Sequence, residues 1–168
     1  RNEGKNIVAM EADGPGVIWR IWSALPKEGN ICIYIDGEEA VRCPFRDFFE
    51  RIDSKDIPPM NYPNLTPTLS RGRNRFIPIP FQKHCKIILE ENWGAYYHIT
   101  YTVYPEDTIL PTISDMYCNS SMIALAETDR ILGFKGSYPY EGYGDQICKK
   151  TITIPSKGEK SLFQRDNN

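Results

Sequence analysis

Residues 30–43, NICIYIDGEEAVRC, decide the fold class of this chain. Isoleucine occupies every second position from 31 to 35, and a period of two is typical of a β-strand with one buried face. The dipeptide Asp36-Gly37 follows, which is a strong signal for a turn between paired strands. The stretch therefore predicts a β-hairpin whose second strand covers residues 39–43.

The neighbouring segments show similar short runs, separated by glycine and proline. Residues 17–25, VIWRIWSAL, are largely apolar on both faces of the predicted strand, which indicates a central strand covered on both sides. Further strands are predicted at residues 6–11, 76–82, 85–91 and 95–104. Pro78 and Pro80 have no backbone N–H to donate to a neighbouring strand. Residues 76–82 should therefore form an edge strand or a bulged one.

Helical spacing of apolar residues appears late in the chain, in SSMIALAETDRILGF at residues 120–134. A short helical turn is also predicted after Pro44. Many short strands with little helix predict an all-β fold with minor helix, a jelly-roll-like antiparallel β-sandwich. We expect residues 1–155 to form this single domain and residues 156–168 to form a polar tail or linker.

Composition narrows the function classes. The chain has 168 residues, of which 40% are hydrophobic and 25% charged, and its net charge is −2. These values fit one ordinary globular domain, and the lack of a basic excess argues against nucleic-acid binding. No apolar run approaches the ~20 residues of a membrane span. The five cysteines are scattered singly, which predicts buried thiols, with no metal site and no cofactor.

Residues 70–81, SRGRNRFIPIPF, place three arginines within five residues. Arg71, Arg73 and Arg75 could bind an anionic or sugar ligand, contact a nucleic-acid backbone, or form a solvated turn that leads into a strand. They close a proline-rich loop at residues 53–74, and loops of such length often carry function.

Aromatic residues follow the arginine cluster. Trp and Tyr rings stack on the C–H faces of sugars, and Arg and Asn side chains form hydrogen bonds with sugar hydroxyls. Packing within the sheet is the alternative explanation for each aromatic residue taken singly. The residues predicted to bind substrate are Arg71, Arg73, Asn74, Arg75, Trp93, Tyr96 and His98.

Catalytic motifs are harder to find. The chain has two histidines, His84 and His98, and neither lies in a nucleophile-elbow, zinc-protease or phosphate-binding motif. Paired carboxylates remain as candidates for glycoside cleavage. Glu11, Asp36 and Glu90 lie on predicted strands, and a self-contained hydrolase would need two of them within about 5–10 Å in one cleft.

Four blocks of sequence occur together: EADGPGVIWRIW, ICIYIDGEEAVRCPFRDFF, RGRNRFIPIPFQKHCKI and WGAYYHITYTVYP. In this order and spacing they resemble the family catalogued as domain of unknown function 2961, which is grouped with glycoside hydrolase family 172. The resemblance covers roughly residues 5–104. It implies two tandem jelly-roll sandwiches, assembly into trimers or hexamers, and retaining hydrolysis of fructofuranosides or arabinofuranosides by two glutamates.

The sequence departs from the family pattern in two places. The usual Ser-Ser-Tyr-Asp-like opening does not precede Arg1, and the Gly-rich Glu-Asp-Tyr-Phe-like motif near the catalytic glutamates does not occur. No catalytic residue is therefore carried over. We expect the N-terminal jelly-roll half of such an enzyme, which supplies scaffold, subunit contacts and part of a substrate cleft. The alternative is a non-catalytic carbohydrate-binding or assembly module.

The resemblance also implies partners. These are an oligosaccharide or glycan ligand, a second jelly-roll domain or partner subunit, and copies of the chain in a trimer-based homo-oligomer. The arginine cluster matches a family block at a loop rim, which would contact sugar, the second sandwich or a neighbouring subunit. The family suggests a periplasmic or secreted location, whereas unpaired cysteines also fit the cytoplasm.

Overall fold

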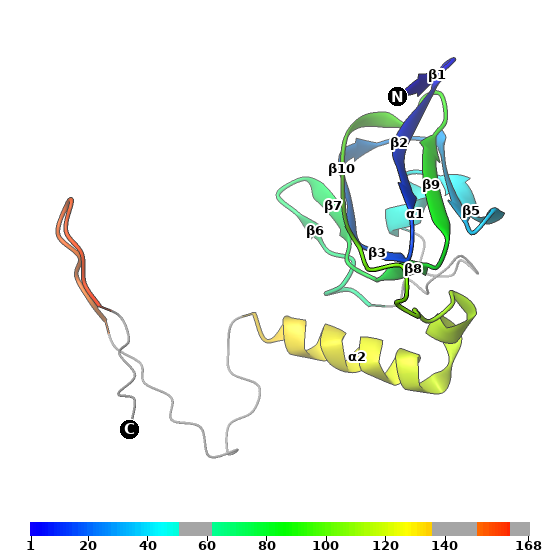
Figure 1. Cartoon of the computed structure of the whole chain (residues 1–168). Helices are drawn as coiled ribbons and strands as arrows, with labels where there is room; N and C mark the ends of the chain where they lie inside the picture. The colour runs from blue at the N-terminus through cyan, green and yellow to red at the C-terminus, as the bar shows by residue number, and fades with distance from the viewer. Residues whose placement is uncertain (51–61, 136–150, 162–168) are drawn as a thin grey trace. The chain divides into compact units, whose positions relative to one another are not determined.

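The computed structural model describes residues 1–50, 62–135 and 151–161. The chain forms two compact units, Arg1–Ser137 and Tyr138–Asn168. In the first unit, two antiparallel sheets pack face to face as a sandwich, with little helix (Figure 1). This confirms the predicted all-β fold with minor helix, a jelly-roll-like antiparallel β-sandwich.

Sheet A contains the hairpin predicted from residues 30–43. Its strand order is β1-β2-β9-β4-β5. The strands are β1 (Asn2–Glu3), β2 (Asn6–Asp13), β9 (His84–Leu89), β4 (Asn30–Ile35) and β5 (Glu38–Pro44). Asp36 and Gly37 both take positive φ values, 54° and 95°, in the turn between β4 and β5. The turn residues read from the sequence therefore make the predicted turn.

Sheet B faces sheet A and has the strand order β10-β3-β7-β6, and β8 also pairs with β3. The strands are β10 (Gly94–Val103), β3 (Gly16–Pro26), β7 (Gly72–Arg75), β6 (Thr68–Leu69) and β8 (Ile79–Phe81). Within the described ranges β8 pairs with β3 alone, which agrees with the edge strand expected from Pro78 and Pro80. At one margin of the sandwich β10 lies beside β2 (Figure 1).

The core fills the space between the sheets. Ile31 and Ile33 of β4, Ile87 of β9, and Ile18 and Ile21 of β3 are each at most 2% exposed. Burial of such side chains is the main stabilising contribution to the sandwich, worth roughly 1.5–3 kcal/mol each. The short helix α1 (Asp47–Glu50) closes one end of this core with two buried phenylalanines.

A β-bulge in β3 decides which side chains face outward. Thr100 of β10 pairs with Arg20 and Tyr101 pairs with Ile18, so Trp19 is an extra residue in β3. Residues 18 and 21 can then both enter the core, while Arg20 lies on the outer face. The expectation that β3 is covered on both sides is wrong, because this outer face is open to solvent and Trp19 is 40% exposed.

A second, smaller cluster holds the helical part of the first unit. The 3-10 helix η1 (Ser114–Tyr117) leads into α2 (Asn119–Gly133), as the spacing of residues 120–134 predicted. Leu125 of α2 packs against Tyr62, Leu65 and Ile77. The carboxylate of Asp129 accepts the backbone N–H groups of residues 64 and 65 at 2.7 and 2.9 Å.

In the second unit, the described residues are 151–161. They form no helix or strand, and one turn is closed by a hydrogen bond of 2.9 Å from Gly158 N to Pro155 O. The tyrosine-rich stretch at residues 138–143 and the first part of the loop at residues 53–74, residues 53–61, lie outside the described ranges.

Candidate functional site

The predicted binding residues on β7 divide between its two faces. Asn74 pairs with Trp22 of β3 on the outer face, whereas Arg75 pairs with the buried Ile21. Arg73 shares the inner face with Arg75, because side chains alternate along a strand. Arg73 and Arg75 therefore face the interior of the sandwich, and Asn74 faces its outer side.

The inward arginines join β7 to α1. Arg75 is 2% exposed, and its Nη1 donates to the carbonyl oxygen of Phe48 at 2.8 Å. The Cζ of Arg75 lies 4.4 Å from the ring centroid of Phe48. Arg73 is half-buried and pairs with Glu50, with Nε to Oε1 at 2.5 Å. Arg71 is exposed in the turn between β6 and β7 at a φ of 69°.

On the outer face, Asn74 is hydrogen-bonded to Arg20, a residue that was not predicted from the sequence. The Nε and Nη2 atoms of Arg20 donate to one oxygen of Asn74, Oδ1, at 3.0 and 2.9 Å. The amide nitrogen of Asn74 donates to the carbonyl oxygens of Pro67 and Gly72 at 3.1 and 3.2 Å. Asn74 is 6% exposed, so these contacts fix the amide with its oxygen toward Arg20.

Aromatic rings and a histidine surround the guanidinium of Arg20. Its Cζ lies 5.9 Å from the ring centroid of Trp22 and 5.6 Å from that of Phe76. These separations suit cation–π attraction. The Nη1 of Arg20 also lies 3.4 Å from Nδ1 of His98, on the neighbouring strand β10. Four side chains, those of Asn74, Trp22, Phe76 and His98, thus meet around the cation of Arg20.

A shallow surface hollow of about 530 Å³ opens over this group. We name it the Arg20 hollow, and its lining residues are Arg20, Trp22, Tyr96, Tyr97 and His98. Tyr96 is 71% exposed and takes a φ of 60°, which is unusual for a bulky residue. Such backbone conformations cluster at binding sites, where the surrounding structure holds them.

Of the predicted residues, the structure brings together Asn74, Tyr96 and His98, and it places Trp93 elsewhere. Trp93 is half-buried and packs edge-on against Phe45 and Tyr97, with ring centroids 6.3 and 5.5 Å apart. A charged residue in the middle of an apolar strand was the signal that could have identified Arg20.

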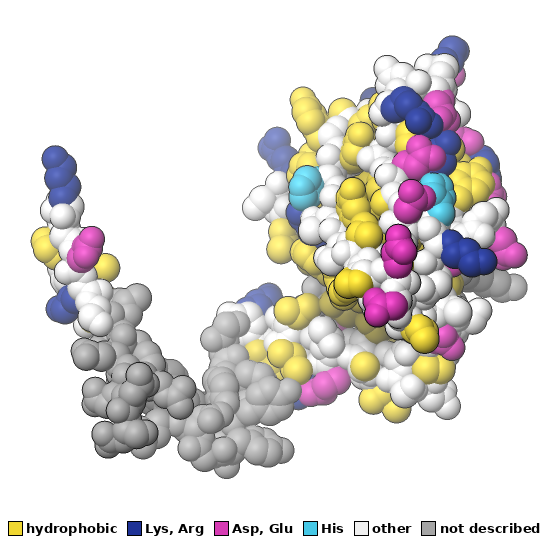
Figure 2. Space-filling model, viewed as in Figure 1, with side chains coloured by type: hydrophobic (Ala, Val, Ile, Leu, Met, Phe, Trp, Pro, Cys, Tyr) yellow, Lys and Arg dark blue, Asp and Glu magenta, His cyan; other side chains and the backbone are white. Residues whose placement is uncertain are grey.

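A second hollow of about 470 Å³ lies at the margin between β2 and β10. It shares Tyr97 and His98 with the Arg20 hollow, and its wall includes Arg1 and Glu11. Figure 2 shows acidic and basic side chains interspersed over β2 and β9, beside a strip of hydrophobic side chains.

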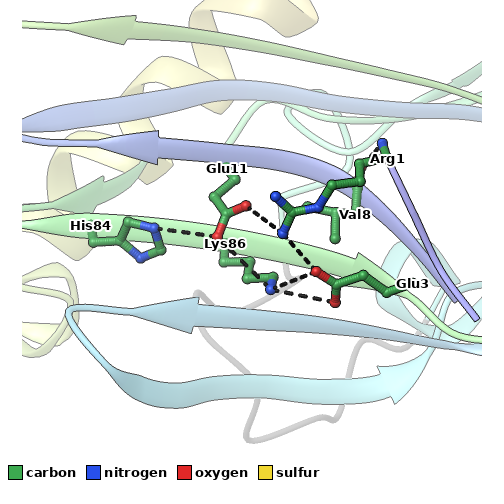
Figure 3. Close-up of polar contacts among 6 residues, drawn as sticks. All are labelled: Arg1, Glu3, Val8, Glu11, His84 and Lys86. Carbon is green, nitrogen blue, oxygen red and sulfur yellow. Dashed lines mark hydrogen bonds and ion pairs between the residues drawn. The ribbon is translucent and has the colours of Figure 1, made fainter.

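The charges near this margin compensate one another, as Figure 3 shows. Glu11 lies 3.2 Å from Nη2 of Arg1, 3.7 Å from Nε2 of His84 and 3.8 Å from Nζ of Lys86. Glu3 contacts Arg1 at 2.6 Å and Lys86 at 3.3 Å, and the hydrogen bond from Arg1 lowers the pKa of Glu3. This network contains two carboxylates and two fixed cations, so it presents little net charge.

Two of the carboxylates considered for catalysis are held as anions. Glu90 accepts from Asn30 at 2.7 Å and from Arg42 at 2.6 Å, and these contacts lower its pKa. Asp36 accepts the backbone N–H groups of Gln82, Lys83 and His84, which keeps its pKa below the ordinary value despite partial burial. A general acid for glycoside cleavage needs a raised pKa.

A third hollow, of about 830 Å³, lies between the β4–β5 turn and residues 109–114. Two of its polar side chains, Asp36 and Gln82, hold neighbouring segments of the chain. Asp36 caps the turn at residues 82–84, and Gln82 bonds to Thr108 O at 2.9 Å and Leu110 N at 3.0 Å. Asp36 and Gln82 are therefore less available to a ligand.

The described part of the chain contains neither a metal-binding cluster nor a helix that could span a membrane. No group of three or more His, Cys, Asp or Glu side chains there could hold a metal ion. None of the helices described is long and apolar enough to cross a membrane. Cys32, Cys43 and Cys85 are buried, as predicted for isolated cysteines, while Cys118 is exposed.

Comparison with known proteins identifies the family of this chain. No curated protein and no solved structure matches the chain. The family model described as GH172 first beta-sandwich domain matches residues 1–119, which include every strand of both sheets and all residues of the Arg20 hollow. The chain therefore belongs to the GH172 family, glycoside hydrolase family 172, through its first β-sandwich domain.

Proposed function

We propose that this β-sandwich is the non-catalytic N-terminal half of a retaining glycoside hydrolase that acts on fructofuranosides or arabinofuranosides. In this role it supplies the scaffold and one carbohydrate-contacting wall of the substrate cleft. The observation that carries the proposal is the Arg20 hollow, in which a fixed guanidinium, a histidine and aromatic rings share one open face.

The chemistry of this surface suits a sugar. Tyr96 and Trp22 offer ring faces for the C–H surface of a sugar, and Arg20 and His98 offer nitrogen atoms for its hydroxyl groups. The polar groups are also held in place before a ligand arrives, because Asn74 is buried and bonded to Arg20 on one side and to the backbone on the other. Such preorganisation reduces the entropy cost of binding.

The carboxylates of this domain support a role in binding rather than in cleavage. The lowered pKa values of Glu90 and Asp36 are opposite to the raised pKa that a general acid requires. We place the glutamate pair that cleaves the substrate in the second sandwich domain that the family resemblance implies.

The test is to measure binding and turnover of furanosides by the same preparation. We expect the chain to bind arabinofuranose or fructofuranose oligosaccharides in calorimetry and to release no free sugar from them. Arg20→Gln should weaken this binding, and Arg130→Gln, which removes a charge from α2 outside the lining of the Arg20 hollow, should leave it unchanged. Robust turnover by this chain would contradict a non-catalytic role.

A contact role in assembly is favoured by a different observation. In the described residues β10 pairs on one side only, with β3, and its Tyr101 and Val103 are 44% and 49% exposed. An open edge with exposed apolar side chains suits pairing with a second domain or a neighbouring copy. Light scattering tests this role: a trimer-based assembly supports it, and a stable monomer at high concentration contradicts it.

A further inference from the structure

We propose that the Arg20 hollow recognises an acidic sugar residue that neighbours the furanoside of the proposed substrate, by binding its carboxylate or sulfate group to the guanidinium of Arg20. This inference rests on the carbohydrate-binding role proposed above and names the class of sugar that the surface prefers.

The first reason is that the charge of Arg20 has no carboxylate partner in the part of the chain that the structure describes. Five other arginines there are ion-paired with Asp or Glu side chains: Arg1, Arg42, Arg46, Arg73 and Arg130. Of the remaining two, Arg71 is exposed in a turn and Arg75 is buried against Phe48. Arg20 instead contacts a neutral amide and a histidine. It is also half-buried between two aromatic rings, where solvent screens its attraction for an anion less than on an open surface.

The second reason is the orientation of the guanidinium. Nε and Nη2 form one side of its plane, and both donate to Oδ1 of Asn74. The far end of the plane carries one N–H of Nη1 and the second N–H of Nη2. The Nη1 contact with His98 is 3.4 Å, which is long for a hydrogen bond. Two oxygens of a carboxylate or sulfate fit this end as a bidentate partner.

The third reason is what lies beside that end. The hollow is lined by Tyr96, Tyr97 and Trp22 as well as by Arg20 and His98. A sugar ring that places its acidic group on Arg20 could therefore rest on an aromatic face. The strained backbone of Tyr96, at a φ of 60°, keeps this exposed ring at the rim of the hollow.

The decisive experiment compares two ligands that differ in charge and little else. A galacturonic acid trimer and its methyl ester are titrated into the full chain by calorimetry at low salt. We expect the acid to bind at least about tenfold more tightly, the effect of one charge-assisted contact. The difference should shrink as salt is added. A sulfated galactose trimer and its unsulfated form make the same comparison for sulfate, so the two sources of the anion are distinguished.

Variants assign the preference to Arg20. Arg20→Gln should abolish the difference between acid and ester, whereas Arg130→Gln, a matched loss of one positive charge, should retain it. Should Arg20→Gln not fold, the side-chain Nε–H resonance of Arg20 in the unaltered protein gives the same information. That resonance should shift with the acid and not with the ester.

The outcomes separate this inference from the proposed function. Equal affinity for each anionic sugar and its neutral form, together with binding of neutral furanosides, overturns the inference and leaves the proposed function standing. No binding of acidic or neutral sugars overturns both. A preference for the acid that survives in Arg20→Gln also overturns the inference, because another cation would then be responsible.

Discussion

Arg75 and Phe48 are joined by two contacts, a hydrogen bond of 2.8 Å from Nη1 to the Phe48 carbonyl oxygen and stacking of the guanidinium 4.4 Å from the ring centroid. The pair connects β7 to α1 and closes one end of the core. Of the three clustered arginines, Arg75 is thus the one whose surroundings are those of a core residue, with 2% of it exposed.

Substitution of Arg75 should therefore affect stability. We expect Arg75→Met to lower the free energy of unfolding by about 1–3 kcal/mol, because a buried carbonyl loses its donor. Arg71→Met should change the free energy of unfolding by less than about 0.5 kcal/mol, because Arg71 is exposed. Urea unfolding followed by circular dichroism measures both, and equal effects would contradict a core role for Arg75.

Gly72 sets the position of Trp22. A Cβ atom at position 72 would collide with Nε1 of Trp22, so Gly72→Ala should displace the indole from the Arg20 hollow. We expect a loss of stability of about 1–3 kcal/mol and a severalfold loss of sugar affinity. Gly4→Ala is the control for sugar affinity: its added carbon meets no atom, although the φ of 65° at Gly4 strains any side chain there. Retention of full affinity in Gly72→Ala would show that Trp22 takes no part in binding.

Asp36 should make stability depend on pH. Partial burial would raise its pKa, but hydrogen bonds from the backbone N–H groups of His84, Lys83 and Gln82 outweigh that effect and lower the pKa. A lowered pKa in the folded state means that the anion contributes stability above the unfolded pKa. That contribution is lost as the pH falls through the folded value.

We therefore expect Asp36→Asn to be less stable than the unaltered protein at pH 7, by up to about 1 kcal/mol, because Asp36 is exposed and solvent screens its charge. Asparagine tolerates the positive φ of 54° at this position, so the substitution tests the charge rather than the turn. Urea unfolding at several pH values should show the two proteins converging as the pH falls below about 4. A difference that persists at low pH would mean that the charge is not its cause.

Cys118 should be the most reactive of the described thiols. Hydrogen bonds with Ser120 and Ser121 lower its pKa to about 7, whereas burial raises the pKa of Cys32 and Cys85 to about 12. Iodoacetamide should modify Cys118 with half-maximal rate near pH 7, because the thiolate is the nucleophile.

The cysteine experiment uses a Cys148→Ser background, since position 148 lies outside the described residues. Ser121→Ala should move the midpoint of the rate profile upward, and mass spectrometry locates the modified residue. An unchanged midpoint would show that the serine contacts do not set the reactivity of Cys118.

Several elements could be predicted from local sequence. The alternation at residues 31–35 and the turn at Asp36-Gly37 gave the β4–β5 hairpin, because side-chain period and turn chemistry are local properties. The helical spacing at residues 120–134 predicted α2 in the same way. The family resemblance, built on four short blocks, was confirmed over residues 1–119.

The residues around the Arg20 hollow were predicted less completely. Asn74, Tyr96 and His98 were singled out from the sequence, but Arg20 and Trp22 were not, because β3 was expected to be covered on both faces. The bulge at Trp19 brings Ile18 and Ile21 to the same side, and a bulge is set by pairing with β10. Pairing between strands so far apart along the chain cannot be read from the alternation of β3 alone.

The sequence by itself determined that this chain forms short antiparallel strands with turns at Gly, Asp and Pro, because those preferences act between neighbouring residues. Only the tertiary structure decided which side chains share a surface. Arg20, Asn74 and His98 come from three different strands, and they meet because β3 lies between β7 and β10. Their separate places in the sequence carry no record of that order, since strand order is fixed by the packing of the whole sandwich.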